Sequence, residues 1–286
     1  MSITLKESEA QAFYDAADEL YDMYVEAADY VIDNDLFFEL GIPFNLVEAI
    51  KKSWENDVHW HIYGAFQFSG GLNNTPIKLE GFDADTPKNL LETSQEQLDE
   101  THFNEIYEKV STNFKRLITL DEGINLFEER YDGWKILFSA PADDEKQEEE
   151  MLFLEQMAQD AGFETGFSYL HEVVFNEDGI FDAYDEQYEY WFKSYKWHDM
   201  GSQEPELATL LTSIMKKQSA IILNPAYCTI FEAKGFIDIL RKTYPDSPYL
   251  QTNTTDTNLI ANVYFAYEAC GLSFLKNGLF STHKIS

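Results

Sequence analysis

The clearest pattern in the chain is a helical repeat of hydrophobic residues near its start. Within 6–33, acidic residues surround apolar positions that recur at steps of three and four, namely Phe13, Ala17, Leu20, Tyr24, Ala28 and Val31. This spacing predicts one long amphipathic helix with a buried stripe and an acidic outer face. Weaker helical patterns predict further helices at 45–56, 88–100, 102–117, 141–161, 205–218 and 231–243.

Shorter apolar runs bounded by turn residues predict the strands. A Gly-Gly and Asn-Asn turn inside 59–83 indicates a β-hairpin. Further strands are expected at 135–140, 166–174, 180–184, 220–224, 260–267 and 271–276. The alternation of helices and strands favours an α/β or α+β fold with mixed sheets.

The charge of the chain restricts its partners. The 286 residues include 52 acidic and 20 basic side chains, which gives a formal net charge of −32, while 44% hydrophobic residues argue against disorder. Such a charge repels nucleic acid and anionic membranes, and it attracts polyamines or basic proteins. The simpler alternative is a solvated acidic surface that serves solubility.

Several residue types predict structural roles rather than chemistry. Cys228 and Cys270 lack CxxC spacing and are expected to be small buried residues in a reducing cytosol. His59 and His61 have a zinc-chelating spacing, but nothing nearby completes a metal site. The aromatic stretch 188–197 favours packing over base stacking. No secretory leader or apolar run of about 18 residues is evident, so a cytoplasmic location is expected.

The hairpin carries a family resemblance. Its strands contain Tyr-Gly-Ala-Phe-Gln-Phe and Ile-Lys-Leu-Glu-Gly-Phe-Asp, and the second runs into Ala-Asp-Thr-Pro at 84–87. The segment resembles the metal-binding hairpin of the glutathionylspermidine synthase family, ATP-grasp carbon–nitrogen ligases whose pattern reads roughly Tyr-Gly-Arg-Phe-Asp-Phe, a turn, then Ile-Lys-Leu-Leu-Glu-Tyr-Asn-Ala-Asp-Thr-Pro. Similar stretches at 33–43, 195–200, 224–245 and 267–274 extend the likeness to most of 10–285.

The resemblance implies one synthetase-like domain over 1–286. Its N-terminal helices and hairpin would occupy about 1–120, an α/β part about 121–250, and a remnant of the ATP-grasp strands about 251–286. The family's nucleotide-gripping subdomain carries a Lys-Pro segment and a Gly-Arg-Glu-Gly loop. Here only a short Thr/Asn-rich connection stands between Leu250 and Ile260.

Residues that carry the family chemistry are replaced. Ala65, Gln67 and Gly81 stand where the family pattern has arginine, aspartate and glutamate, and Leu275 falls at or near a terminal arginine. Mg²⁺ prefers carboxylate oxygens, and a bidentate guanidinium matches phosphate. The resemblance therefore implies a degraded metal and nucleotide site.

Four positions remain as candidate site residues. Asp83 replaces an asparagine and is the one position where a metal contact is retained, if any is. Asp85 and Thr86 belong to the same remnant, and Thr86 matches a small hydroxyl residue near the peptide substrate. Glu80 lies one position out of register, so strand alternation predicts that it points to the opposite face. Acidic residues at 148–150 match family positions near the substrate cleft, although a helix N-terminus explains them equally well.

Three functions follow as hypotheses. The first is a pseudoenzyme that binds a polycation such as a polyamine, or a basic protein, and needs no cofactor. The second is a divergent ligase that uses ATP and Mg²⁺ to join a peptide carboxylate to a polyamine amine through Asp83, Asp85 and Glu80. The third is an acidic structural or decoy protein that binds basic surfaces. None of the three involves nucleic acid or a membrane.

Overall fold

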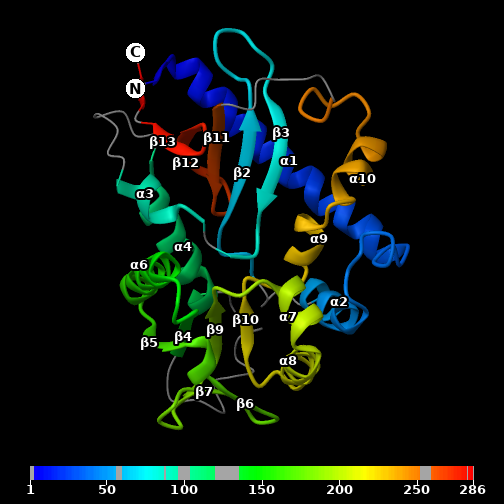
Figure 1. Ribbon diagram of the computed structural model, residues 1–286, viewed down its shortest axis with the longest axis vertical. Helices are drawn as coiled ribbons and strands as arrows, with labels where there is room; N and C mark the ends of the chain where they lie inside the picture. Colours follow the sequence, from blue (N-terminus) through cyan, green and yellow to red (C-terminus); the bar gives the residue numbers. More distant parts are fainter. Residues whose placement is uncertain are drawn as a thin grey trace.

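The first long helix forms as its hydrophobic repeat predicts. The computed structural model describes residues 3–55, 60–86, 88–95, 104–119, 135–251, 259–281 and 283–285. Helix α1 (Glu7–Asp33) occupies nearly all of the predicted segment. Every residue of its predicted stripe is at most 1% exposed. The ring of Phe13 packs on Phe68 and Phe274, so the stripe faces the sheet that α1 crosses in Figure 1.

An antiparallel sheet packs against α1. Among the described residues its strand order is β13-β12-β11-β2-β3, and these strands are Leu279–Ser281, Ala269–Lys276, Leu259–Phe265, Gly64–Ser69 and Lys78–Asp83. Strands β2 and β3 form the predicted hairpin, and the late strand β11 pairs with the free edge of β2. Phe66 and Phe82 stack across the hairpin with ring centroids 3.9 Å apart. Strand β3 runs toward the middle of the molecule and ends there at Asp83 (Figure 1).

A second, parallel sheet forms the other half of the molecule. Its order is β10-β9-β4-β5, and the strands are Ile221–Leu223, Tyr190–Lys193, Lys135–Ala140 and Glu164–Tyr169. Phe138 and Phe192 belong to one hydrophobic cluster, whereas their neighbours Leu137 and Trp191 belong to another. Since successive strand residues point to opposite faces, both faces are covered, which explains the continuous apolar runs in these strands.

Helices surround the two sheets (Figure 1). The larger ones are α4 (Ile106–Thr119), α6 (Glu145–Ala161) and α8 (Pro205–Lys217). The shorter helices are η1 (Phe44–Leu46), α2 (Val47–Glu55), α3 (Leu90–Gln95), η2 (Leu170–Glu172), α7 (Trp197–Gln203), α9 (Cys228–Glu232) and α10 (Phe236–Thr243). The remaining strands are β1 (Ile3–Leu5) with β14 (His283–Ile285), and β6 (Val174–Asn176) with β7 (Gly179–Phe181) and β8 (Gln187–Tyr188).

The mixed α/β fold class is confirmed, and several predicted elements have wrong boundaries; the predicted strand 180–184 ends at Phe181, and the predicted helix 141–161 begins at Glu145. The predicted helix 231–243 is two helices, because Ala233 is extended with ψ 131° and ends α9. The predicted strand 166–174 stops at Tyr169, where a 3₁₀ turn replaces pairing. The second half of the predicted helix 88–100 lies outside the described residues. The division at about 120 and 250 stays a prediction.

Candidate functional site

A polar cleft lies where the end of β3 meets the parallel sheet. It consists of two adjoining hollows of about 520 and 380 Å³, and both are lined by Asp83, Lys88 and Lys196. We call this pair of hollows the Asp83 cleft. Its side chains come from the hairpin, from the N-terminal turns of α6, from the segment after β9 and from α9, which converge at the waist of the molecule (Figure 1).

Asp83 is engaged by nitrogen donors. Gln67 Nε2 donates to Asp83 Oδ2 at 2.6 Å, and Lys88 Nζ lies 3.2 Å from the same oxygen. Gln67 stands where the family pattern has aspartate, so an amide donor now occupies a position where a carboxylate would join Asp83. Within the part of the chain that the structure describes, no group of three or more His, Cys, Asp or Glu side chains is placed to hold a metal ion.

The predicted orientation of Glu80 is wrong. A β-bulge interrupts the pairing of β2 with β3, since Gln67 pairs with Gly81 but Phe68 pairs with Leu79. Glu80 is therefore the extra residue, and its carboxylate accepts a hydrogen bond from Ser69. Ser69 shares a face of β2 with Gln67, so the bulge returns Glu80 to the cleft side, where it lines the smaller hollow. Strand alternation alone could not reveal this.

Asp85 has a buried partner and does not line either hollow. Its carboxylate contacts Lys193 Nζ at 2.7 Å and accepts the backbone N–H of Trp197 at 2.5 Å. The Lys193 and Asp85 side chains are 0% and 2% exposed. Burial raises the pKa of Asp85, and the Lys193 ammonium opposes that shift. Asp85 is thus positioned to tie the hairpin to β9 rather than to meet a ligand.

Thr86 does line the larger hollow, as a residue near a substrate would. The backbone just before Thr86 is held by a residue from another part of the chain. The Glu232 carboxylate accepts the N–H groups of Ala84 and Asp85 at 2.9 and 3.0 Å. Lys196 Nζ then contacts the other Glu232 oxygen at 2.6 Å. Neither Glu232 nor Lys196 was predicted, because no spacing in the sequence links residues so far apart.

Asn224, which directly follows β10 of the parallel sheet, also holds the backbone of the hairpin segment. It is fully buried, accepts the N–H of Ile62, and donates to the carbonyls of Tyr63 and Ala84. His61 is also buried, contacts Tyr21 and Ala84 O, and has a pKa lowered by burial to about 4. A structural role for His61 fits these contacts, while His59 lies outside the described residues.

The lost cationic positions are filled by apolar packing. Ala65 is 2% exposed and sits between Asp83 on β3 and Tyr264 on β11. Leu275 pairs with Ile260 and Phe280 at the far side of the sheet. The predicted polar connection at 251–258 lies almost wholly outside the described residues. Cys228, Cys270 and most of the aromatic stretch are buried as predicted.

Glu150 is the unusual group of the cleft. It sits in the second turn of α6, lines the larger hollow and is 2% exposed. Its Oε1 atom is buried and has no hydrogen-bond partner among the described residues. Burial raises the pKa of this carboxyl to about 7, while Lys146 and the backbone N–H groups of Asn89 and Leu90 oppose the shift and Glu92 adds to it. A buried carboxylate oxygen without a partner is costly unless a ligand supplies a donor.

The lysines of the larger hollow are already neutralised. Lys88 pairs with Asp83, Lys146 with Glu92 at 2.6 Å, and Lys196 with Glu232. Ammonium groups in such pairs contribute little net positive potential. Asp144 and Asp199 add further carboxylates to the lining. The larger hollow is therefore suited to a cation more than to an anion.

Two comparisons with known proteins bear on this site. A family model described as glutathionylspermidine synthase preATP-grasp matches residues 1–279. The structure of a glutathione synthetase-like effector (GSS30) from Globodera pallida, in its apo form, is similar with a TM-score of 0.53 at 7% identity, over 99% of this chain and 89% of that chain. At this identity the likeness concerns the fold alone. No described helix has both the length and the apolar character needed to cross a membrane.

Proposed function

This chain belongs to the glutathionylspermidine synthase family, and from that premise we propose that it is a family member that binds a polyamine-type cation in the Asp83 cleft without ATP-dependent ligation. The observation that carries the proposal is the buried, unpartnered Oε1 of Glu150 in the larger hollow. A protonated amine in this hollow would oppose the buried charge of the Glu150 carboxylate.

The donors at the hairpin do not fit a magnesium-bound triphosphate. Gly81 has no side chain, Gln67 offers an amide, and Asp83 Oδ2 already accepts from Gln67 and contacts Lys88. Mg²⁺ needs several oxygen ligands in a near-octahedral arrangement. Lys88 already supplies a cation to Asp83, and the remaining side chains offer too few oxygen ligands for such a metal ion.

Spermidine binding is expected to depend on Glu150. Isothermal titration calorimetry at pH 8 should show affinity falling about 10- to 100-fold in Glu150→Gln, because a hydrogen bond to a charged group contributes about 1.5–3 kcal/mol. For wild-type protein the affinity should rise about tenfold from pH 6 to pH 8, since the empty site has a Glu150 pKa near 7 and only the ionised form binds a cation well.

The matched control is Glu149→Gln. Glu149 precedes Glu150 on α6 but is exposed, so its substitution removes the same charge from the protein without touching the hollow. Equal loss of affinity in both variants would mean that spermidine binds the acidic surface generally. In that case the cleft is not the binding site.

One observation favours the second candidate, a divergent ligase. The bulge at Glu80 returns a carboxylate to the side of Asp83, which partly replaces the glutamate lost at Gly81. We expect no micromolar binding of Mg-ATP and no ADP release when glutathione and spermidine are added together. ADP release that is abolished by Glu80→Gln and by Asp83→Asn would overturn the proposal in favour of the ligase.

A further inference from the structure

A pair of carboxylates lies beside the larger hollow of the Asp83 cleft. Glu92 belongs to α3 and Glu150 to α6. One oxygen of each, Glu92 Oε2 and Glu150 Oε1, is buried without a hydrogen-bond partner among the described residues. The charge of Glu92 opposes the ionisation of Glu150, so the two carboxylates are close enough to act on each other. Two acids in this arrangement are stabilised by a cation near both of them.

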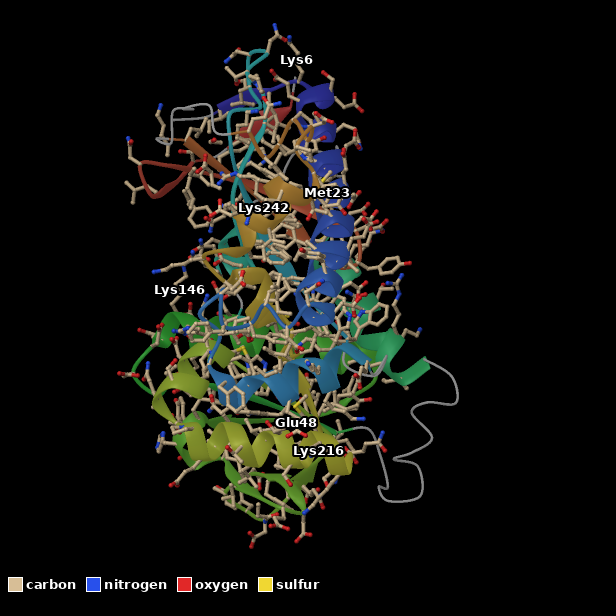
Figure 2. All side chains as sticks on the ribbon, turned by 90° about the vertical axis from the view of Figure 1, so that its right-hand side faces the viewer. Lys6, Met23, Glu48, Lys146, Lys216 and Lys242 are labelled. Carbon is tan, nitrogen blue, oxygen red and sulfur yellow. The ribbon has the colours of Figure 1, made fainter. Side chains whose placement is uncertain are left out.

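One lysine lies within reach of both carboxylates. Lys146 is in the first turn of α6, four residues before Glu150, so the two side chains project from the same face of the helix. Both line the larger hollow, and Figure 2 shows Lys146 at the waist of the molecule. The Lys146 ammonium contacts Glu92 Oε1 and Asn89 Oδ1, each at 2.6 Å. Within the described parts of the chain, no ion pair joins it to Glu150.

Asn89 connects the two carboxylates to the lysine. Its backbone is left-handed, with φ 56°, a conformation that asparagine adopts more readily than most residues. Its backbone N–H favours the ionised form of Glu150, while its side-chain oxygen accepts a hydrogen bond from Lys146. Asn89 thus serves Glu150 through its backbone and holds Lys146 on the side of Glu92.

The contact between Lys146 and Glu92 is easily broken. Their side chains are 50% and 37% exposed, and ion pairs of this kind are weak. A lysine also carries its charge on a flexible four-carbon stem. Glu150 attracts the same ammonium, because burial leaves its charge poorly solvated. The two contacts to Glu92 and Asn89 together outweigh this attraction, so loss of the charged one releases the lysine.

We propose that Glu92 is a positioning residue that holds Lys146 away from Glu150 and so keeps the amine site open. Without the Glu92 carboxylate, the Lys146 ammonium turns to Glu150 and competes with the ligand. The effect on affinity rests on the proposed amine binding, whereas the position of Lys146 can be tested in ligand-free protein. Tyr63 and Tyr264 also lie near Glu150, but burial raises the pKa of both, so they stay neutral.

The first test is calorimetry with spermidine at pH 8. Glu92→Gln should bind about tenfold more weakly than wild type, since Lys146 then occupies Glu150. Adding Lys146→Met should restore affinity to about the wild-type level. The matched control adds Lys217→Met instead, which removes an equal charge from a distant exposed pair and should restore affinity less than about twofold. An affinity that stays low in Glu92→Gln/Lys146→Met would overturn the inference, because misplacement of α3 would then explain the loss.

The second test needs no ligand. Carbon-13 NMR follows the titration of the Glu150 carboxyl, whose signal is absent from Glu150→Gln. In Glu92→Gln the pKa should fall from about 7 by about 1–3 pH units, since a like charge is lost and the lysine arrives. In Glu92→Gln/Lys146→Met it should fall less, because only the like charge is lost.

The two readouts separate the inference from the proposed function. Equal Glu150 pKa values in Glu92→Gln and Glu92→Gln/Lys146→Met would overturn the inference, even if wild type binds spermidine, because Lys146 would not have moved. If the pKa values differ as expected but no form of the protein binds spermidine, the proposed function fails and the positioning of Lys146 by Glu92 stands.

Discussion

Replacing Lys193 by methionine is expected to lower the free energy of unfolding by about 3–5 kcal/mol, because it leaves the Asp85 carboxylate buried without its counter-ion. The pair is the most deeply buried ion pair of the described residues, with Lys193 Nζ 2.7 Å from Asp85 Oδ1. Lys193 also lies 4.9 Å from the centre of the Trp197 ring. Urea unfolding followed by circular dichroism measures the change.

Two control variants distinguish the loss of the buried ion pair from the loss of a positive charge in general. Lys217→Met removes an equal charge from an exposed pair with Glu177 and should cost at most about 1 kcal/mol. Adding Asp85→Leu to Lys193→Met should restore much of the lost stability, since two apolar groups then replace two charges. If Lys193→Met were as mild as Lys217→Met, the pair would not be what ties the hairpin to β9.

Glu150→Gln is expected to stabilise the ligand-free protein by up to about 3 kcal/mol at pH 8 and to leave it unchanged near pH 4.5. The folded pKa of Glu150 is raised from 4.5 to about 7, so its contribution is fully present below 4.5 and is lost as pH rises through 7. A shift of this size corresponds to about 3 kcal/mol. Glutamine stays neutral at every pH, so the variant does not lose this stability as the pH rises. Unfolding in urea at several pH values, compared between variant and wild type, measures the difference.

The control and the ligand sharpen this result. Glu149→Gln, on the exposed face of the same helix, should show no comparable gain at pH 8. Saturating spermidine should stabilise wild type more than Glu150→Gln, because ligand that binds only the folded state adds its binding free energy. Equal stability of variant and wild type at pH 8 would show that Glu150 is not held as a buried charge. The cost of a buried Glu150 charge in the ligand-free protein would then not be the reason that the protein binds an amine.

Much of the fold was predictable because its signals are local. Steps of three and four residues marked α1, and apolar runs marked β4 and β10, whereas β9 was not predicted as a strand within the aromatic stretch 188–197. The Asn277-Gly278 dipeptide, a residue pair that favours tight hairpin turns, connects β12 to β13, and both residues adopt positive φ. The predictions failed where a break depends on one backbone angle, as at Ala233, or on an extra residue, as at Glu80.

The site was predictable only in part. Asp83, Thr86 and Glu80 line the Asp83 cleft, but Asp85 turns away to Lys193. Glu232 and Lys196 were missed, and acids at 148–150 matched the family without any sign that Glu150 differs from its neighbours. Which of the carboxylates at 148–150 is buried depends on the segments that pack against α6.

The sequence by itself determined the family, the mixed α/β fold class and the loss of acid and arginine at the hairpin, because these follow from residue identities and short-range periodicity. Only the tertiary structure decided what the altered positions now do. It placed Lys88 and Gln67 on Asp83, returned Glu80 to the cleft through a bulge, and left one oxygen of Glu150 without a partner. Contacts and burial between distant segments set these properties, and no local pattern encodes them.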